Sequence, residues 1–161
     1  MTTRVLGVDP GSQITGYGVL EPSNGRPARL IECGIIRTNP KDHLSKRLHA
    51  LHDGLTELIR RHQPDTLAVE DIFYAKNVRT TVVLGHARGA ILLAAAQAGI
   101  EVAEFAPATV KKTIVGTGAA QKNQIGFMVQ RLLNLDAPPS PPDAADGVAV
   151  ALTYLMTRPP V

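Results

Sequence analysis

TRVLGVDPGSQITGYGVLE, residues 3–21, consists of two apolar runs on either side of a proline–glycine turn. Short apolar runs joined by such a turn predict a pair of antiparallel strands, here at 3–9 and 14–21. A third strand, ARLIECGII at 28–36, extends the pair into a three-stranded antiparallel meander. The first strand ends in Asp9, and an acidic residue rarely closes an apolar strand unless a cation meets it there.

The rest of the chain alternates between helical and strand-like patterns. Leucines spaced three and four residues apart before Pro64 predict an amphipathic helix. After that helix we expect, in order, a buried strand at 66–70, a helix at 78–98, a strand at 101–105, and helices at about 109–114, 123–133 and 143–157. This order predicts an α/β fold with a mixed sheet, and no linker divides the chain, so we expect one domain over residues 1–161.

Size and composition favour an intracellular globular protein. The 161 residues are 44% hydrophobic and 19% charged, a mixture that can bury a core and is too apolar for a disordered chain. The single cysteine, Cys33, forms no internal disulfide, and neither a signal peptide nor an apolar stretch of membrane-spanning length is recognisable. We therefore expect a cytoplasmic protein without membrane contact.

Four carboxylates stand at the ends of expected elements. Asp9 closes the first strand, Glu70 closes the strand at 66–70, and Asp143 and Asp146 begin the last helix. Residues three apart on a helix share one face. If the fold brings these elements together, their oxygens form a ligand set that suits hard divalent cations.

Each of these acids also has a purely structural interpretation. Asp143, after Pro142, could be the N-cap of the last helix, and an acid in a first helical turn is favoured by the helix dipole. Asp9 could cap the turn that follows it. Alternation along the strand does not decide whether Glu70 or its neighbour Asp71 faces the site.

The middle of the chain is basic. Residues 76–131 contain seven Lys or Arg residues and two acidic ones, Glu101 and Glu104. A charge excess alone is often a solvated face, but beside a carboxylate cluster it favours a phosphate-bearing polyanion as substrate. Two divalent cations held by several carboxylates hydrolyse phosphodiesters by in-line displacement.

A glycosidase needs two carboxyls and no basic segment. DPGSQITGYG also resembles the first hairpin of sugar kinases and actin-like ATPases, which need a second domain.

Five motifs, in chain order, resemble the RuvC family of bacterial Holliday-junction resolvases. They are GVDPGSQITGYGV (7–19), VEDIFYAKN (69–77), LGHARGAI (84–91), APATVKKTIVGTGAAQK (106–122) and DAADGVAVAL (143–152). The resemblance implies an RNase H-like fold with a mixed five-stranded sheet, three antiparallel strands followed by two parallel ones, flanked by helices. It also implies a homodimer that uses two Mg²⁺ ions per subunit, with Mn²⁺ as an alternative, and that works with the RuvA–RuvB branch-migration complex. The metal-binding and catalytic residues that it implies are Asp9, Glu70, Asp143 and Asp146. Some relatives carry histidine at the position of Asp143.

The resemblance also implies which residues contact a four-way DNA junction. The family's junction-contacting aromatic falls on Phe73, and its DNA-contacting lysines fall on Lys111 and Lys122. Tyr74 shares the loop with Phe73, and Lys76 and Lys112 belong to the same basic segment, so we expect them to contact DNA as well. From the residues alone, an aromatic at the position of Phe73 is more often a core residue than a functional one. We expect Lys122 to lie in a flexible loop, GTGAAQKNQ at 116–124.

The helix at 78–98 is the expected homodimer contact. Its apolar residues cover more than one face, and Gly85 and Gly89 would let two helix backbones approach closely. We interpret His86 on this helix as a packing or interface residue. The histidines of the first helix (His43, His49, His52 and His62) are expected to face solvent.

These features predict an endonuclease that resolves Holliday junctions by paired nicks. The alternatives are an RNase H-like nuclease acting on RNA or another branched structure, and a DNA-binding subunit without catalysis. The presence of all four carboxylates argues against the latter.

Overall fold

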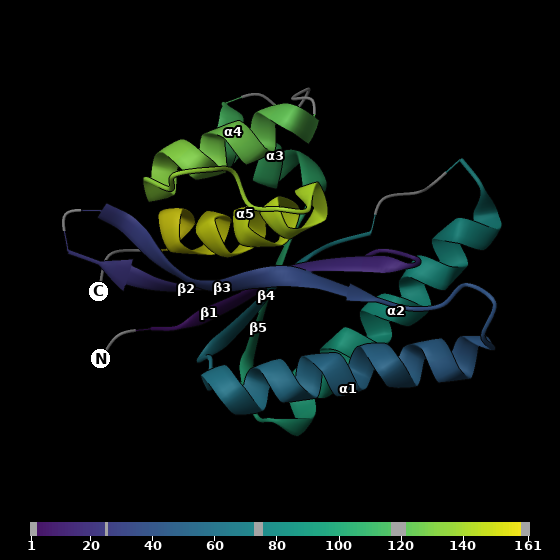
Figure 1. Cartoon of the computed structure of the whole chain (residues 1–161). Helices are drawn as coiled ribbons and strands as arrows, with labels where there is room; N and C mark the ends of the chain where they lie inside the picture. Colours follow the sequence, from purple (N-terminus) through teal and green to yellow (C-terminus); the bar gives the residue numbers. More distant parts are fainter. Residues whose placement is uncertain (1–2, 25, 73–75, 117–121, 159–161) are drawn as a thin grey trace.

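A five-stranded sheet lies between two layers of helices in the computed structural model, which describes residues 3–24, 26–72, 76–116 and 122–158 (Figure 1). The strands are β1 (Val5–Asp9), β2 (Ile14–Ser23), β3 (Arg26–Arg37), β4 (Thr66–Glu70) and β5 (Glu101–Phe105). Their order across the sheet is β3-β2-β1-β4-β5. β1, β2 and β3 are antiparallel neighbours, whereas β4 is parallel to β1, and β5 to β4. The predicted mixed sheet is confirmed.

Two helices cover one face of the sheet and three cover the other (Figure 1). The helices are α1 (Leu44–His62), α2 (Val78–Gln97), α3 (Pro107–Val115), α4 (Lys122–Leu133) and α5 (Pro142–Thr157). α3 begins two residues before the predicted start because proline is well tolerated at a first helical position. Lys122 is the first residue of α4, so its predicted place in a loop is wrong. Among the described helices, none combines the length and hydropathy needed to cross a bilayer.

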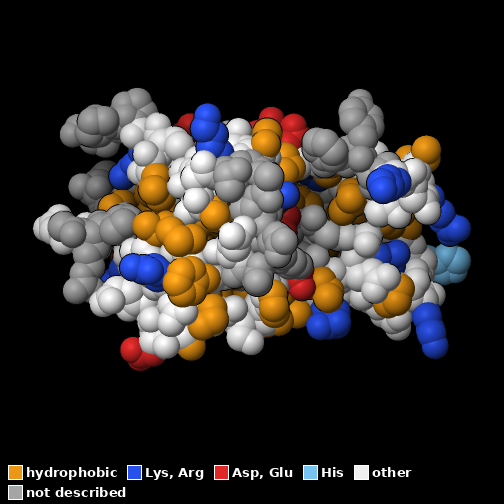
Figure 2. Space-filling model, turned by 90° about the horizontal axis from the view of Figure 1, so that it is seen from above, with side chains coloured by type: hydrophobic (Ala, Val, Ile, Leu, Met, Phe, Trp, Pro, Cys, Tyr) orange, Lys and Arg blue, Asp and Glu red, His pale blue; other side chains and the backbone are white. Residues whose placement is uncertain are grey.

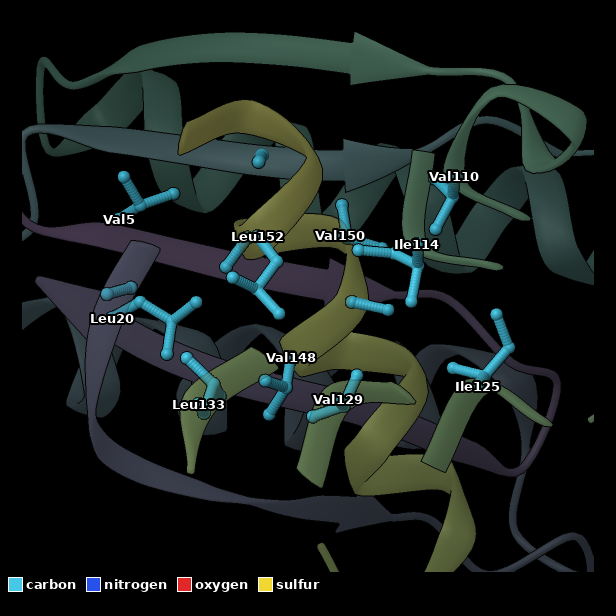
Figure 3. Packing of buried hydrophobic residues seen from close by; sticks show 14 residues of the cluster. Val5, Leu20, Val110, Ile114, Ile125, Val129, Leu133, Val148, Val150 and Leu152 are labelled. Carbon is cyan, nitrogen blue, oxygen red and sulfur yellow. The ribbon is translucent and has the colours of Figure 1, made fainter. Parts of the chain in front are cut away.

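Each face of the sheet has its own hydrophobic core. On the α1–α2 face, the predicted leucine stripe is confirmed, since Leu51, Leu55 and Leu58 are buried. On the other face, α5 is buried along most of its length between the sheet and α4. Figure 3 shows Val129 of α4 beside Val148 of α5 within this second core.

Glycines let α5 lie unusually close to the sheet. A Cβ added at Gly16 would lie 1.8 Å from the backbone oxygen of Asp143, and one at Gly147 would lie 2.4 Å from the Cα of Tyr17. Real Cβ atoms do not approach other atoms so closely, so a side chain at either position would push helix and sheet apart. These contacts fix the first turns of α5 against the hairpin of β1 and β2.

A polar network joins α1 to β2 and β3. His62 is buried, with its Nε2 2.5 Å from a carboxylate oxygen of Glu32, so the prediction that it faces solvent is wrong. Tyr17 donates a hydrogen bond to the same carboxylate, and burial together with that contact raises the pKa of Tyr17 to about 12. Burial alone would raise the pKa of Glu32, but His62, Tyr17 and Arg61 bring it below its ordinary value. The end of α1 is therefore anchored by buried polar contacts as well as by leucines.

Candidate active site

Three carboxylates from three elements line one cavity of about 250 Å³. Asp9 and Glu70 end β1 and β4, which run parallel with Val8 paired to Val69, so the two acids leave the sheet side by side. Asp146 reaches the cavity from α5. The carboxyl ends of neighbouring parallel strands, with the start of a helix placed over them, thus bring together residues far apart in the sequence.

The remaining cavity wall is apolar apart from one lysine. Among the described residues, the other lining side chains are Pro107, Val110 and Lys111 of α3, Ile125 of α4 and Ala149 of α5. An apolar wall lowers the local dielectric and strengthens interactions between charged groups. Three acids and one lysine give the cavity an acidic balance, which favours binding of cations.

The donor set fits a hard divalent cation. Carboxylate oxygens are the ligands that Mg²⁺ and Mn²⁺ prefer, and Asp9, Glu70 and Asp146 present them to one space. Within the described residues, no group of three or more His, Cys, Asp or Glu side chains is gathered tightly enough to hold a metal ion. The three acids therefore line the cavity without converging on one point.

Asp143 lies nearly one helical turn before Asp146, and it is not among the described residues that line the cavity. The N-cap of α5 is Pro141 and Pro142 is the first helical residue, so the interpretation of Asp143 as an N-cap is wrong. Asp143 sits in the first turn, where the helix dipole still favours a negative charge.

Glu70 and Asp71 have different surroundings. Glu70 is half-buried and lines the cavity, whereas Asp71 is exposed and forms an ion pair with Arg88 of α2, with its Oδ1 3.5 Å from Nε. The Asp71 carboxylate also accepts a hydrogen bond from the backbone N–H of Ile72. Of the two neighbouring acids, Glu70 is the one that faces the cavity.

Of the predicted DNA-contacting residues that the structure describes, Lys111 is the one that lines the cavity. Lys112 and Lys76 are exposed. Lys122 begins α4. Phe73 and Tyr74 lie outside the described residues. In the view of Figure 2, more Lys and Arg side chains lie at the end of the molecule where α1 and α2 begin than at the opposite end.

Sequence reasoning did not identify several features of the site. The apolar wall from α3 and α4 was not predicted, because its residues carry no chemical signature of their own. Arg88 is one of seven Lys and Arg residues at 76–131, and its sequence context does not reveal its contacts with Asp71 and Glu104. His86 is exposed and lines a shallow groove between α1 and α2 with His49, His52 and Leu93.

Comparison with known proteins identifies the family. A family model described as crossover junction endodeoxyribonuclease RuvC matches residues 5–154. The crossover junction endodeoxyribonuclease RuvC of Halorhodospira halophila is 49% identical over 156 residues, which cover 97% of this chain and 92% of the relative.

Solved structures agree with the sequence match. The structure of Thermus thermophilus RuvC has a TM-score of 0.86 and 32% identity, covering 96% of this chain and 94% of that one. T. thermophilus RuvC in complex with its Holliday junction substrate has the same TM-score at 30% identity and the same coverage. The sheet order and the flanking helices are thus those of an RNase H-like resolvase. With nearly its whole length matched in sequence and in structure, the chain belongs to the RuvC family of crossover junction endodeoxyribonucleases.

Proposed function

We propose that this chain, as a single nuclease domain over residues 1–161, resolves Holliday junctions by paired symmetric nicks during DNA recombination and repair. The observation that carries the proposal is the cavity in which Asp9, Glu70 and Asp146 meet Lys111. Such a cavity can hold cations and a phosphate together, and family membership supports a crossover junction as the DNA.

The cavity would hold two divalent cations, Mg²⁺ or Mn²⁺, on Asp9, Glu70 and Asp146, with Asp143 as a further ligand from the preceding turn of α5. Bound there, the cations would activate water and stabilise the leaving oxygen of the phosphodiester. The carboxylates supply the negative charge that balances the cations. Pro107, Val110 and Ile125 exclude bulk water from one side of the cavity.

Lysines would position the DNA backbone over the carboxylates. Lys111 lies inside the cavity, where its ammonium can contact the phosphate being cut. Lys76, Lys112 and Lys122 would contact flanking phosphates, which adds affinity and a dependence on salt. Phe73 and Tyr74 would stack on bases unpaired at the crossover.

The homodimer would form through one face of α2. Val78, Val82 and Leu93 are 78%, 52% and 52% exposed, and they share a face with His86 and Gly89 because the spacings are four, four, three and four residues. The opposite face of α2, with Ala87, Ile91 and Ala94, is buried in the chain's own core. A Cβ at Gly89 would meet nothing within 4 Å, so a partner helix can approach closely there.

A two-fold dimer would present two cavities to a junction whose opposed strands are themselves related by two-fold symmetry. Two nicks in strands of like polarity then give duplexes that a ligase can seal. We also propose that the protein acts in the cytoplasm together with RuvA–RuvB, which supplies and moves the junction. These two points rest on family membership.

The test is cleavage of a synthetic four-way junction, of a linear duplex of the same sequence and of an RNA–DNA hybrid, each with Mg²⁺ and with EDTA. The proposal predicts symmetric nicks on the junction alone, and only with Mg²⁺. Equal cutting of the linear duplex would identify a nuclease without junction selectivity, and cutting of an RNA–DNA hybrid in preference to the junction would favour the RNase H-like alternative.

A further inference from the structure

Arg88 joins three elements beside the cavity. It belongs to α2, and its guanidinium pairs with Glu104 of β5 through Nη2 and lies 3.5 Å from Asp71, measured from Nε to Oδ1. The Arg88 side chain is 16% exposed, whereas those of Asp71 and Glu104 are about half exposed. The arginine is therefore the buried centre of this contact, and the two acids lie over it.

The contact closes a ring across the ends of β4 and β5. The backbone N–H of Asp71 donates a 2.7 Å hydrogen bond to the carbonyl oxygen of Phe105, and Glu70 is paired with Phe105 in the sheet. Asp71 follows Glu70 directly, and Glu104 precedes Phe105. One guanidinium thus ties the two residues that flank the Glu70–Phe105 pair, so Glu70 is held from both strands.

This arginine is costly to bury. The Nε atom of Arg88 is buried and has no hydrogen-bond partner. Among the described side chains, no other buried nitrogen or oxygen lacks one. A charged group with an unsatisfied donor destabilises the fold unless its other contacts compensate. The ion pair between Arg60 and Glu57 on α1 is different, because both side chains are exposed and two hydrogen bonds of 2.9 and 2.7 Å join them.

We infer that Arg88 is a positioning residue that orients Glu70 toward the cavity and thereby sets the affinity of the site for divalent cations. It acts through Asp71 and Glu104 and touches neither the cation nor the DNA. Partners bonded directly to metal ligands change metal affinity or activity by about 10–100-fold when they are removed, and Arg88, which acts through the residue next to Glu70, should have an effect at the lower end of this range. The inference rests on the proposed function of the cavity.

The test is Arg88→Met, which keeps most of the side-chain length and removes the charge. We expect Mn²⁺ binding, followed by the electron paramagnetic resonance of free Mn²⁺, to weaken by about 10-fold. The Mg²⁺ concentration for half-maximal junction cleavage should rise in parallel, and saturating Mg²⁺ should recover most of the rate. Junction binding without metal should be unchanged. Arg60→Met, the matched loss of an exposed ion pair, should alter none of these.

Two milder variants keep the inference testable if Arg88→Met does not fold, as judged by circular dichroism. Arg88→Lys and Glu104→Gln should each weaken Mn²⁺ binding severalfold. Wild-type Mn²⁺ affinity in the folded variants would overturn the positioning role while leaving the proposed function intact. Conversely, a wild-type protein that binds Mn²⁺ but cuts no junction would overturn the proposed function, and the Mn²⁺ affinities would still decide the role of Arg88.

Discussion

Glu70 and Asp71 are adjacent acids that the fold treats differently. Glu70 ends β4 and faces the cavity, while Asp71 turns outward to Arg88. The strand pattern alone predicted that the strand at 66–70 ends in an acidic residue directed to the carboxylate cluster. It left open whether that residue is Glu70 or Asp71. The choice depends on the pairing of β4 with β5 and on a contact with α2, both of which are tertiary.

The two acids of α5 should differ in their effect on cleavage. Asp146 lines the cavity, so Asp146→Asn should slow junction cleavage by about 10³-fold, since metal catalysis is worth several kcal/mol. Asp143→Asn should cost less, and Asp143→His should retain activity because histidine can also bind a metal. Single-turnover cleavage with saturating enzyme separates these rates. An Asp143→Asn loss as large as that of Asp146→Asn would contradict the distinction.

Lys111 should contribute one phosphate contact. Lys111→Ala should reduce the slope of log binding constant against log salt by about one unit, because one fewer counterion is released. Junction binding measured by fluorescence anisotropy at several salt concentrations gives this slope. Arg60→Ala, at an exposed position in the last turn of α1, is the control and should leave the slope unchanged. If Lys111→Ala also leaves both slope and cleavage unchanged, Lys111 does not contact the DNA.

At the scale of elements, the close packing of α5 on the sheet determines where Asp146 lies. Gly16 and Gly147 let the helix lie against β2, which brings Asp146 to the ends of β1 and β4. The sequence predicted α5 and the presence of two acids on one face of it. It could not predict which acid would reach the cavity, because that depends on close helix–sheet contacts. The glycines permit these contacts, but a glycine in the sequence does not show which segment will pack against it.

Replacing Gly16 should therefore separate α5 from the sheet. Gly16→Ala places a Cβ 1.8 Å from the backbone oxygen of Asp143, and we expect the free energy of unfolding to fall by about 2–3 kcal/mol. Gly126→Ala on α4 is the matched control, because its Cβ would meet neighbours at 3.8 and 3.9 Å. That change should be neutral or stabilise by up to about 1 kcal/mol. Urea denaturation measures both, and equal effects would contradict the role of close packing.

The apolar residues of α2 are distributed differently from the sequence-based expectation. Its apolar residues were expected on several faces, and the structure divides them into a buried face and an exposed face. Ile91 is fully buried, so a charged substitution at this position would disrupt the core of the chain itself and would not report on a dimer contact. Periodicity could not make this division, since alanine, valine and leucine occur on both sides.

For the whole molecule, the proposed dimer predicts that a charged substitution on the exposed face of α2 will prevent dimerisation. Leu93→Glu should yield a monomer in analytical ultracentrifugation and should uncouple the two nicks on a junction, because a charge would be buried against the partner helix. Met156→Glu, at another exposed apolar position on α5, is the control and should remain dimeric. A monomeric wild type, or a Leu93→Glu variant that stays dimeric and nicks in pairs, would contradict a dimer through α2.

The strands and the approximate extents of the helices followed from sequence patterns because hydrophobic spacing reports local structure directly. The arrangement of three antiparallel strands followed by two parallel ones was expected from the resemblance to the RuvC family. Hydrophobic spacing placed an acid at the end of β1 and at the end of β4, but their meeting depends on the two strands being neighbours in the sheet. The cavity wall from α3 and α4 and the ring around Arg88 could not be predicted. They arise where segments distant in the sequence meet, and their residue types are ordinary.

The most direct test of the central claim, that the cavity at the ends of β1 and β4 is the nuclease centre, is to measure binding and cleavage of the same four-way junction by wild-type protein and by Glu70→Gln. The substitution removes one charge and keeps the shape of the side chain. We predict that Glu70→Gln binds the junction at least as tightly as wild type, since a negative charge near phosphate is lost, and that its cleavage in Mg²⁺ falls by about 10³-fold. Cleavage by Glu70→Gln at close to the wild-type rate would contradict the assignment.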